Sequence, residues 1–220
     1  MLQAPAKRNT RLSTRNIVNP QYARRITKAA FDYAIVLPAL ILLAPLMLLI
    51  ALVIKLETPG PVIHRRRVLG MGGREFNMYT FRTVYINGNE RLINNRKQWV
   101  ALLNHERNAH DPRITRTGLF LRRFGLDVLP KMINILRRQM SLVGPQAIAR
   151  RDLLRIGQQR AQAITSILPG LTGLWQIQAR NTTLKDRLNL DLRYIKAWSL
   201  RLDLQILVGT FIAVREEQIL

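Results

Sequence analysis

The segment "RRFGLDVLPKMINIL", residues 122–136, holds a single carboxylate among apolar and cationic residues. Asp127 follows two arginines and precedes Pro130 by three positions. A carboxylate can act as a covalent nucleophile, and a nearby arginine favours its ionised form. Asp is also a preferred helix N-cap, and the pattern predicts a helix over residues 127–138. The residues alone leave both roles open for Asp127, nucleophile and cap.

Arginines at predicted loop positions form a second group of candidate functional residues. Arginine binds phosphate through two parallel hydrogen bonds and stays charged, although a single surface arginine is usually only solvated. The glycine-rich turns "LVGP" and "PGLTG" would let backbone N–H groups approach an anion. Together these features indicate a diphosphate substrate bound through Arg82, Arg113, Arg116, Arg122, Arg123 and Arg180.

The composition limits the possible partners. The chain of 220 residues carries a formal net charge of +22, which calls for a polyanionic partner. It has no cysteine, which excludes a disulfide scaffold and any cysteine-ligated zinc site. Aromatic residues are few and no recognition motif is present, so we expect no nucleic-acid partner. Phosphorylated substrates and an anionic membrane face remain as possible partners.

Residues 35–54, "IVLPALILLAPLMLLIALVI", contain no charged, hydroxyl or amide side chain. As a helix they would extend roughly 30 Å, the thickness of a bilayer core. Both flanks are basic, and basic flanks prefer the cytoplasm. A re-entrant helix that breaks near Ala44 and Pro45 and returns to the same face satisfies both flanks. The alternatives are a tilted, kinked single span and a buried core helix.

The rest of the chain favours helices with short extended pieces. Extended pieces are expected at residues 61–68 and 75–85, and the segments "MSLVGPQA" and, apart from one short extended piece, "LPGLTGLWQIQAR" are expected to be loops. Helices are expected at 91–108, before Gly125, at 127–138, 150–166 and 184–217, with an amphipathic stretch at 200–214 against anionic lipid. The predicted fold is mostly α: a basic segment (1–28), a re-entrant membrane helix (29–55) and a compact cytoplasmic helical domain with interfacial helices (56–220).

At this level of detail the chain resembles a known family, the bacterial sugar transferases or small monotopic phosphoglycosyl transferases. The resemblance covers about residues 24–214, in "KAAFDYAIVLPALILLAPLMLLIALVIKLETPGPV", "GGREFNMYTFRT", "DPRITRTGLFLRR", "LDVLPKMINIL", "MSLVGP", "PGLTGLWQIQAR" and "LDLRYI…SLRLDLQIL". It implies transfer of a sugar phosphate from a nucleotide diphosphosugar to polyprenyl phosphate, with Mg²⁺. The reaction would take place at the cytoplasmic face of the bacterial inner membrane and start exopolysaccharide or glycoconjugate assembly. The resemblance implies that Asp127 is the nucleophile and a magnesium ligand. An oligomer is a further possible assembly of this chain.

The chain departs from the family pattern near the site. Val128 stands where the family has the Glu of an Asp-Glu pair, and Gln146 stands where it has an arginine. Other departures are a lysine, two serines, a glutamine and a glycine of the family, replaced here by Thr80, Ala44, Gly125, Lys131 and Ala179. The alternative interpretation is a member that keeps the fold and acts as a membrane-bound partner or scaffold without catalysis.

Overall fold

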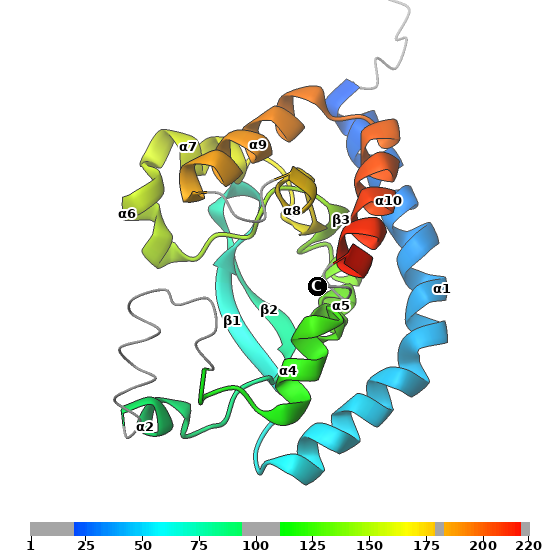
Figure 1. Ribbon diagram of the computed structural model, residues 1–220. Coiled ribbons are helices and arrows are strands. Elements are labelled where there is room, and N and C mark those ends of the chain that lie inside the picture. Colours follow the sequence, from blue (N-terminus) through cyan, green and yellow to red (C-terminus); the bar gives the residue numbers. More distant parts are fainter. Residues whose placement is uncertain (1–19, 94–110, 179–182, 217–220) are drawn as a thin grey trace, which may run out of the picture.

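The computed structural model describes residues 20–93, 111–178 and 183–216, drawn in colour in Figure 1. These parts of the chain are mostly helical and include two small two-stranded sheets, which confirms the predicted fold class. The helices are α1 (Pro20–Glu57), α2 (Gly88–Ile93), α4 (Arg116–Arg123), α5 (Lys131–Leu136), α6 (Leu153–Ile156), α7 (Gln158–Ile164), α8 (Leu174–Gln178), α9 (Leu184–Ala197) and α10 (Leu200–Glu216). Short 3-10 turns lie at η1 (Met71–Gly73), η2 (Leu126–Val128) and η3 (Arg150–Asp152).

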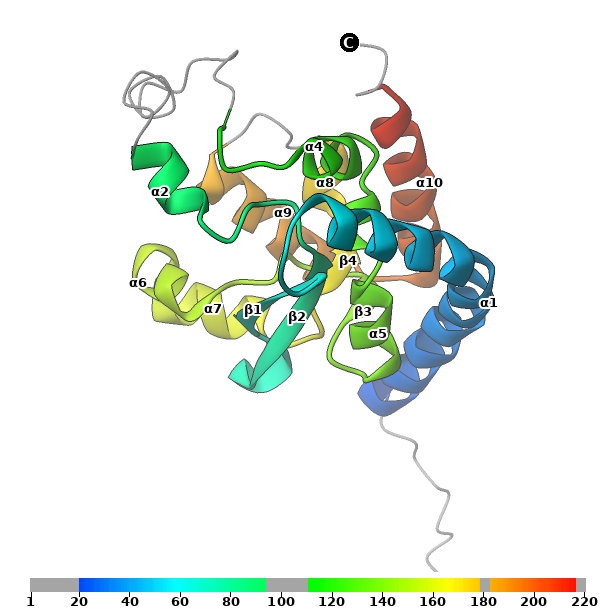
Figure 2. The ribbon, with the colours of Figure 1, turned by 90° about the horizontal axis from the view of Figure 1, so that it is seen from below.

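Helix α1 is long and apolar enough to cross a membrane over residues 25–57. Only 11% of the most apolar 18-residue segment of this helix is buried inside the protein, which argues against a core helix. Ile41, Leu42 and Leu48 are each more than 70% exposed. The helix bends as it runs along one side of the body (Figures 1 and 2), and Pro38 and Pro45 lie within it. Because each proline lacks an N–H, one helical hydrogen bond is lost at each position. The re-entrant path stays a prediction.

A β-hairpin follows α1. Strand β1 (Ile63–Leu69) pairs antiparallel with β2 (Glu75–Phe81), with Ile63 opposite Phe81 and Leu69 opposite Glu75. Both strands lie where the sequence predicts extended pieces, although β2 ends four residues before the predicted end.

The second sheet and the helix that follows it correct two predicted loops, while the second strand of this sheet is the short extended piece predicted in "LPGLTGLWQIQAR". Strand β3 (Ser141–Val143) lies within "MSLVGPQA" and pairs parallel with β4 (Gly170–Thr172), after which α8 forms. The backbones of Gly144 and Gly170 approach so closely that a Cβ on either would collide with backbone atoms of the other. This pairing joins residues far apart in sequence, which explains why local pattern did not reveal β3.

Two predicted helices are divided in the structure. The helix predicted over 150–166 is interrupted at Gly157, where φ is +82°. The helix predicted over 184–217 is two helices, because the chain is extended at Trp198 between α9 and α10. Of the helix predicted over 91–108, only the end of α2 is described, and residues 94–110 lie outside the described residues.

A buried polar cluster attaches the first part of α1 to the body. Lys28 Nζ lies 2.7 Å from Asp203 Oδ2 and 3.4 Å from Asp32 Oδ1. Tyr194 Oη and Trp198 Nε1 also donate to Asp203, at 2.7 and 3.2 Å. We call Lys28, Asp32, Tyr194, Trp198 and Asp203 the N-terminal clamp. It is surrounded by the main apolar core, which includes Val36, Ile135, Met140, Val143 and Ile206.

Candidate active site

Asp127 lies in η2, the 3-10 turn between α4 and α5. Gly125 precedes this turn with φ +63°, a conformation that glycine adopts without strain. Pro130 occupies the N-cap position of α5, and that cap has no side-chain hydrogen bond. The interpretation of Asp127 as the N-cap of this helix is therefore wrong. The cap position belongs to a proline because α5 begins four residues after Asp127.

The half-buried Asp127 carboxyl lies within a cluster of cations. Burial raises its pKa, whereas Lys131 and Arg122 act in the opposite direction. Burial also lowers the pKa of Lys131, with Arg66 acting in the same direction and Asp127 opposing it. Asp127 is thus the acidic member of a group that contains Arg66, Arg122 and Lys131. Burial removes water from these charged side chains. A diphosphate bound here would supply hydrogen-bond acceptors to the cations in place of that water.

Arg122 extends from the last turn of α4, and its Nε donates to Thr83 Oγ1 at 3.0 Å. The guanidinium otherwise remains exposed, so it can reach an anion beside Asp127. Arg123 is exposed on the same turn. Lys131 and Arg66 were missed by sequence reasoning. Lys131 could have been found, because it follows Asp127 by four residues, whereas Arg66 comes from β1 and reaches the group only through the fold.

Arg82 is buried and has a structural role at the end of α1. It is 5% exposed, and its guanidinium donates to the carbonyl oxygens of Pro59 at 2.6 Å and Thr58 at 2.8 Å. It also reaches the carbonyl of Ile54 in the last turn of α1, at 3.5 Å. The carbonyl of Ile54 also accepts the backbone N–H of Thr58 at 3.2 Å. Because the last carbonyls of a helix lack helical donors, the Arg82 guanidinium caps the C-terminal end of α1. The structure does not bring its guanidinium to Asp127.

Arg113 is paired with Asp111. Its Nε lies 2.9 Å from Oδ1 and its NH2 lies 2.7 Å from Oδ2 of that carboxylate. The hydrogen bonds from Arg113 lower the pKa of Asp111, and Arg122 also lowers it. Asp111 is therefore a second carboxylate near Arg122 that sequence reasoning missed. Of the other predicted phosphate ligands, Arg116 is exposed at the start of α4, and Arg180 lies outside the described residues.

The far end of α1 orients α4, which leads to the site. Glu57, the last residue of α1, accepts hydrogen bonds from the backbone N–H groups of Arg116 at 2.8 Å and Thr117 at 3.2 Å. A carboxylate at this end favours the helix, because the N-terminus of a helix carries partial positive charge. We call Glu57, Arg82 and the first turn of α4 the C-terminal clamp. It fixes the orientation of α4, and thereby the positions of Arg122 in its last turn and of Asp127 in the turn that follows.

The donor set allows only a limited role for the expected magnesium ion. Among the described residues no group of three or more His, Cys, Asp or Glu side chains could hold a metal. Mg²⁺ at phosphoryl-transfer sites needs only one or two carboxylates, together with substrate phosphates and water. Asp127 fits as one such ligand, while Val128 has no oxygen to contribute.

Comparison with known proteins identifies the class. The family model for bacterial sugar transferases matches residues 23–217, so this chain belongs to the bacterial sugar transferase family. This membership confirms the resemblance and the expectation of a phosphoglycosyl transferase.

Individual relatives agree with this class. The chain is 38% identical over 194 residues to the exopolysaccharide production protein ExoY of Sinorhizobium fredii, and the match covers 86% of this chain and 85% of that protein. It is 35% identical over 194 residues to the UDP-glucose:undecaprenyl-phosphate glucose-1-phosphate transferase of Escherichia coli K12. That match covers 84% of this chain and 39% of the longer relative.

Proposed function

We propose that this protein transfers a sugar 1-phosphate from a nucleotide diphosphosugar to polyprenyl phosphate, starting exopolysaccharide or glycoconjugate assembly. The observation that carries the proposal is Asp127, a half-buried carboxylate among Arg66, Arg122 and Lys131 in a chain of this family. The names of relatives from Xanthomonas campestris and Escherichia coli suggest UDP-glucose as donor and undecaprenyl phosphate as acceptor.

The chemistry requires two displacements at one phosphorus atom. In the first, a carboxylate oxygen of Asp127 attacks the sugar-linked phosphorus, and the bond from this phosphorus to the nucleoside monophosphate breaks. The nucleotide leaves with the bonding electrons, and Asp127 carries a phosphosugar. In the second, an oxygen of polyprenyl phosphate attacks the same phosphorus and releases the Asp127 carboxylate. The product is a polyprenyl diphosphosugar.

The surrounding cations act on both displacements. The carboxylate must be ionised to attack, and Arg122 and Lys131 favour the ionised form against the effect of burial. The same cations would stabilise the charge that develops on the departing nucleotide phosphate. Mg²⁺, held by Asp127 and the substrate phosphates, would neutralise further phosphate charge.

A lipid acceptor requires the site to lie at a membrane surface. Helix α10 supports this location, because Leu204, Val208, Phe211 and Ile212 are each more than half exposed and recur at helical spacing. Helices α1 and α10 lie on the same side of the body (Figures 1 and 2). We propose that α1 enters the inner membrane as a re-entrant helix from the cytoplasmic face. The net charge of +22 would then favour anionic lipid.

The decisive experiment compares the wild type with Asp127→Asn. Transfer should fall by more than about a thousand-fold, because the nucleophile is gone. Stability should change little, because Asp127 does not cap a helix. With donor alone, a phosphosugar adduct should appear on the peptide that contains Asp127 in the wild type only. Glu75→Gln, which removes an exposed carboxylate from β2, is the matched control and should transfer at the wild-type rate.

Val128→Glu tests the departure from the family pair. It should lower the magnesium concentration needed for half-maximal transfer, because it supplies a second carboxylate. Equal transfer by the wild type and Asp127→Asn would refute the nucleophile. No transfer by the wild type or by Val128→Glu, with any nucleotide diphosphosugar, would favour the scaffold interpretation.

A further inference from the structure

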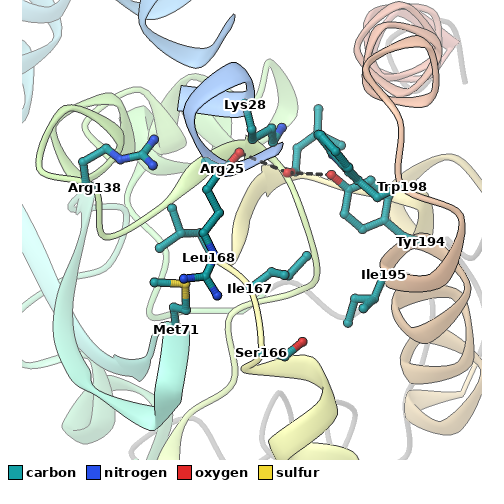
Figure 3. A pocket seen from close by; sticks show the side chains of 12 residues that line it. Arg25, Lys28, Met71, Arg138, Ser166, Ile167, Leu168, Tyr194, Ile195 and Trp198 are labelled. Atoms are coloured by element: carbon teal, nitrogen blue, oxygen red, sulfur yellow. Dashed lines mark hydrogen bonds between the residues drawn. The ribbon is translucent and has the colours of Figure 1, made fainter. Parts of the chain in front are cut away.

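A cavity of about 390 Å³ lies beside the first turns of α1, away from the Asp127 group. Figure 3 shows Arg25 and Lys28 entering it from α1, Arg138 from the turn after α5, and Tyr194 and Trp198 from the end of α9. None of Arg66, Arg122, Asp127 and Lys131 lines it. Met71, from the turn of the β1–β2 hairpin, closes another side.

The cavity contains two arginines without an acidic partner. Lys28 is held by Asp203 and Asp32, but Arg25 and Arg138 form no ion pair with any carboxylate in the described part of the chain. Both side chains are exposed. The guanidinium of Arg138 lies 5.8 Å from the centre of the Tyr33 ring, which leaves its N–H donors available. Two unpaired guanidinium groups at one cavity are suited to an anion.

Arg138 has an unusual backbone for its side chain. Its φ is +57°, and it is the single non-glycine residue with positive φ among those described. It follows the last turn of α5, where helices commonly place a glycine in this conformation. A β-carbon disfavours this region, so the fold retains a large cation where the backbone would suit glycine better. Strained positions of this kind cluster at binding sites.

The walls of the cavity are largely apolar. Ile167, Leu168, Ile195 and Trp198 face it, so a purely polar anion would fill it poorly. Arg25 and Lys28 of its lining lie at the charged start of α1, just before the boundary after which exposed apolar side chains such as Ile35 and Leu37 follow along the same helix. On a membrane-bound α1 this boundary lies at the level of lipid headgroups.

We propose that this cavity binds an anionic phospholipid, with the headgroup phosphate between Arg25 and Arg138 and part of an acyl chain against the apolar walls. The inference depends on the membrane attachment included in the proposed function, but not on catalysis by Asp127. The bound phospholipid would hold the N-terminal end of α1 at the interface. Phosphatidylglycerol is the probe of choice, because its phosphate is the only charge.

Trp198 lines the cavity and provides the measurement. All proteins in this experiment carry Trp99→Phe and Trp175→Phe, so that Trp198 is the single tryptophan of the full chain. Dibrominated phosphatidylglycerol is titrated into this chain in detergent micelles, and quenching of Trp198 reports lipid at the cavity. The test variant is Arg25→Gln with Arg138→Asn, since asparagine tolerates positive φ. The control is Arg155→Gln with Arg160→Gln, which removes the same charge from exposed positions on α6 and α7. Thermal unfolding verifies that both variants are folded.

The apparent affinity should fall by at least about fivefold in the test variant and remain unchanged in the control. Dibrominated phosphatidylcholine should quench weakly, because its headgroup has no net charge. Equal affinities of the two double variants, or equal quenching by both lipids, would overturn the proposal. Displacement by inorganic phosphate, or by polyprenyl phosphate at lower concentration than phosphatidylglycerol, would overturn phospholipid as the occupant. Asp127→Asn should bind like the wild type, so failure of the catalytic proposal leaves this result unaffected.

Discussion

Replacing Asp191 by asparagine should remove part of the pH dependence of stability. Asp191 is fully buried in α9, where its Oδ2 accepts the backbone N–H of Gln146 at 3.0 Å. Its Oδ1 has no hydrogen-bond partner among the described residues. Burial raises the pKa of this carboxyl from 3.8 to about 7, against the smaller opposite effect of the Gln146 hydrogen bond.

The sign and size follow from proton binding. Between the unfolded pKa of 3.8 and the folded pKa of about 7, the folded protein binds more protons than the unfolded chain. Stability therefore falls as pH rises through this window. The rise of about three pH units corresponds to about 4 kcal/mol, lost in full above pH 7. At about pH 5.5 only about 2 kcal/mol of that would be lost.

Urea unfolding in detergent micelles at about pH 5.5 and pH 8 measures the effect, and Asp191→Asn should lose about 2 kcal/mol less than the wild type over this interval. Asparagine keeps an oxygen for the Gln146 N–H. The buried NH₂ group of asparagine lowers the free energy of unfolding equally at both pH values, so its effect cancels from the difference between them. Other titrating groups are present in both proteins, so their contributions cancel as well. Identical pH dependence in the two proteins would refute the raised pKa.

Two further predictions concern α1. Asp203→Asn should destabilise the protein by about 2–4 kcal/mol in urea unfolding, because it leaves Lys28 without its buried partner at 2.7 Å. Glu75→Gln breaks an exposed ion pair with Arg150 and should cost less than about 1 kcal/mol; similar costs for both changes would contradict the N-terminal clamp. Single cysteines at Arg15 and Lys55 should both react with a membrane-impermeant reagent from the cytoplasmic side only. Reaction of either from the outside would mean that α1 spans the membrane.

The sequence was informative where a feature is local. The apolar run predicts α1, and glycines and prolines delimit the two strands of the hairpin. The arginines next to Asp127 in the sequence predict a carboxylate that lies among cations. The prediction that Asp127 caps a helix was wrong, because Pro130 occupies the N-cap position of α5. In each case the signal and the structure lie within a few residues of one another.

The features that were missed depend on contacts between distant residues. Arg82 looks like a phosphate ligand in sequence, but the end of α1 folds back onto it and takes its donors. Arg66 joins the Asp127 group from β1, and Asp203 meets Lys28 across 175 positions. No periodicity or spacing encodes such pairs, because they are set by the packing of whole elements.

The two clamps give α1 a role beyond attachment. One clamp joins Lys28 to Asp203 at the beginning of the helix, and the other joins Glu57 and the last carbonyls to α4 and Arg82 at its end. A helix fixed to the body at both ends cannot shift in the bilayer without moving the body as well. Since α4 starts at the second clamp and leads directly to Asp127, the depth of α1 would set the height of the carboxylate above the lipid. A lipid-borne phosphate lies at a fixed depth in the bilayer, so such a connection would bring the proposed nucleophile and the proposed acceptor to the same depth.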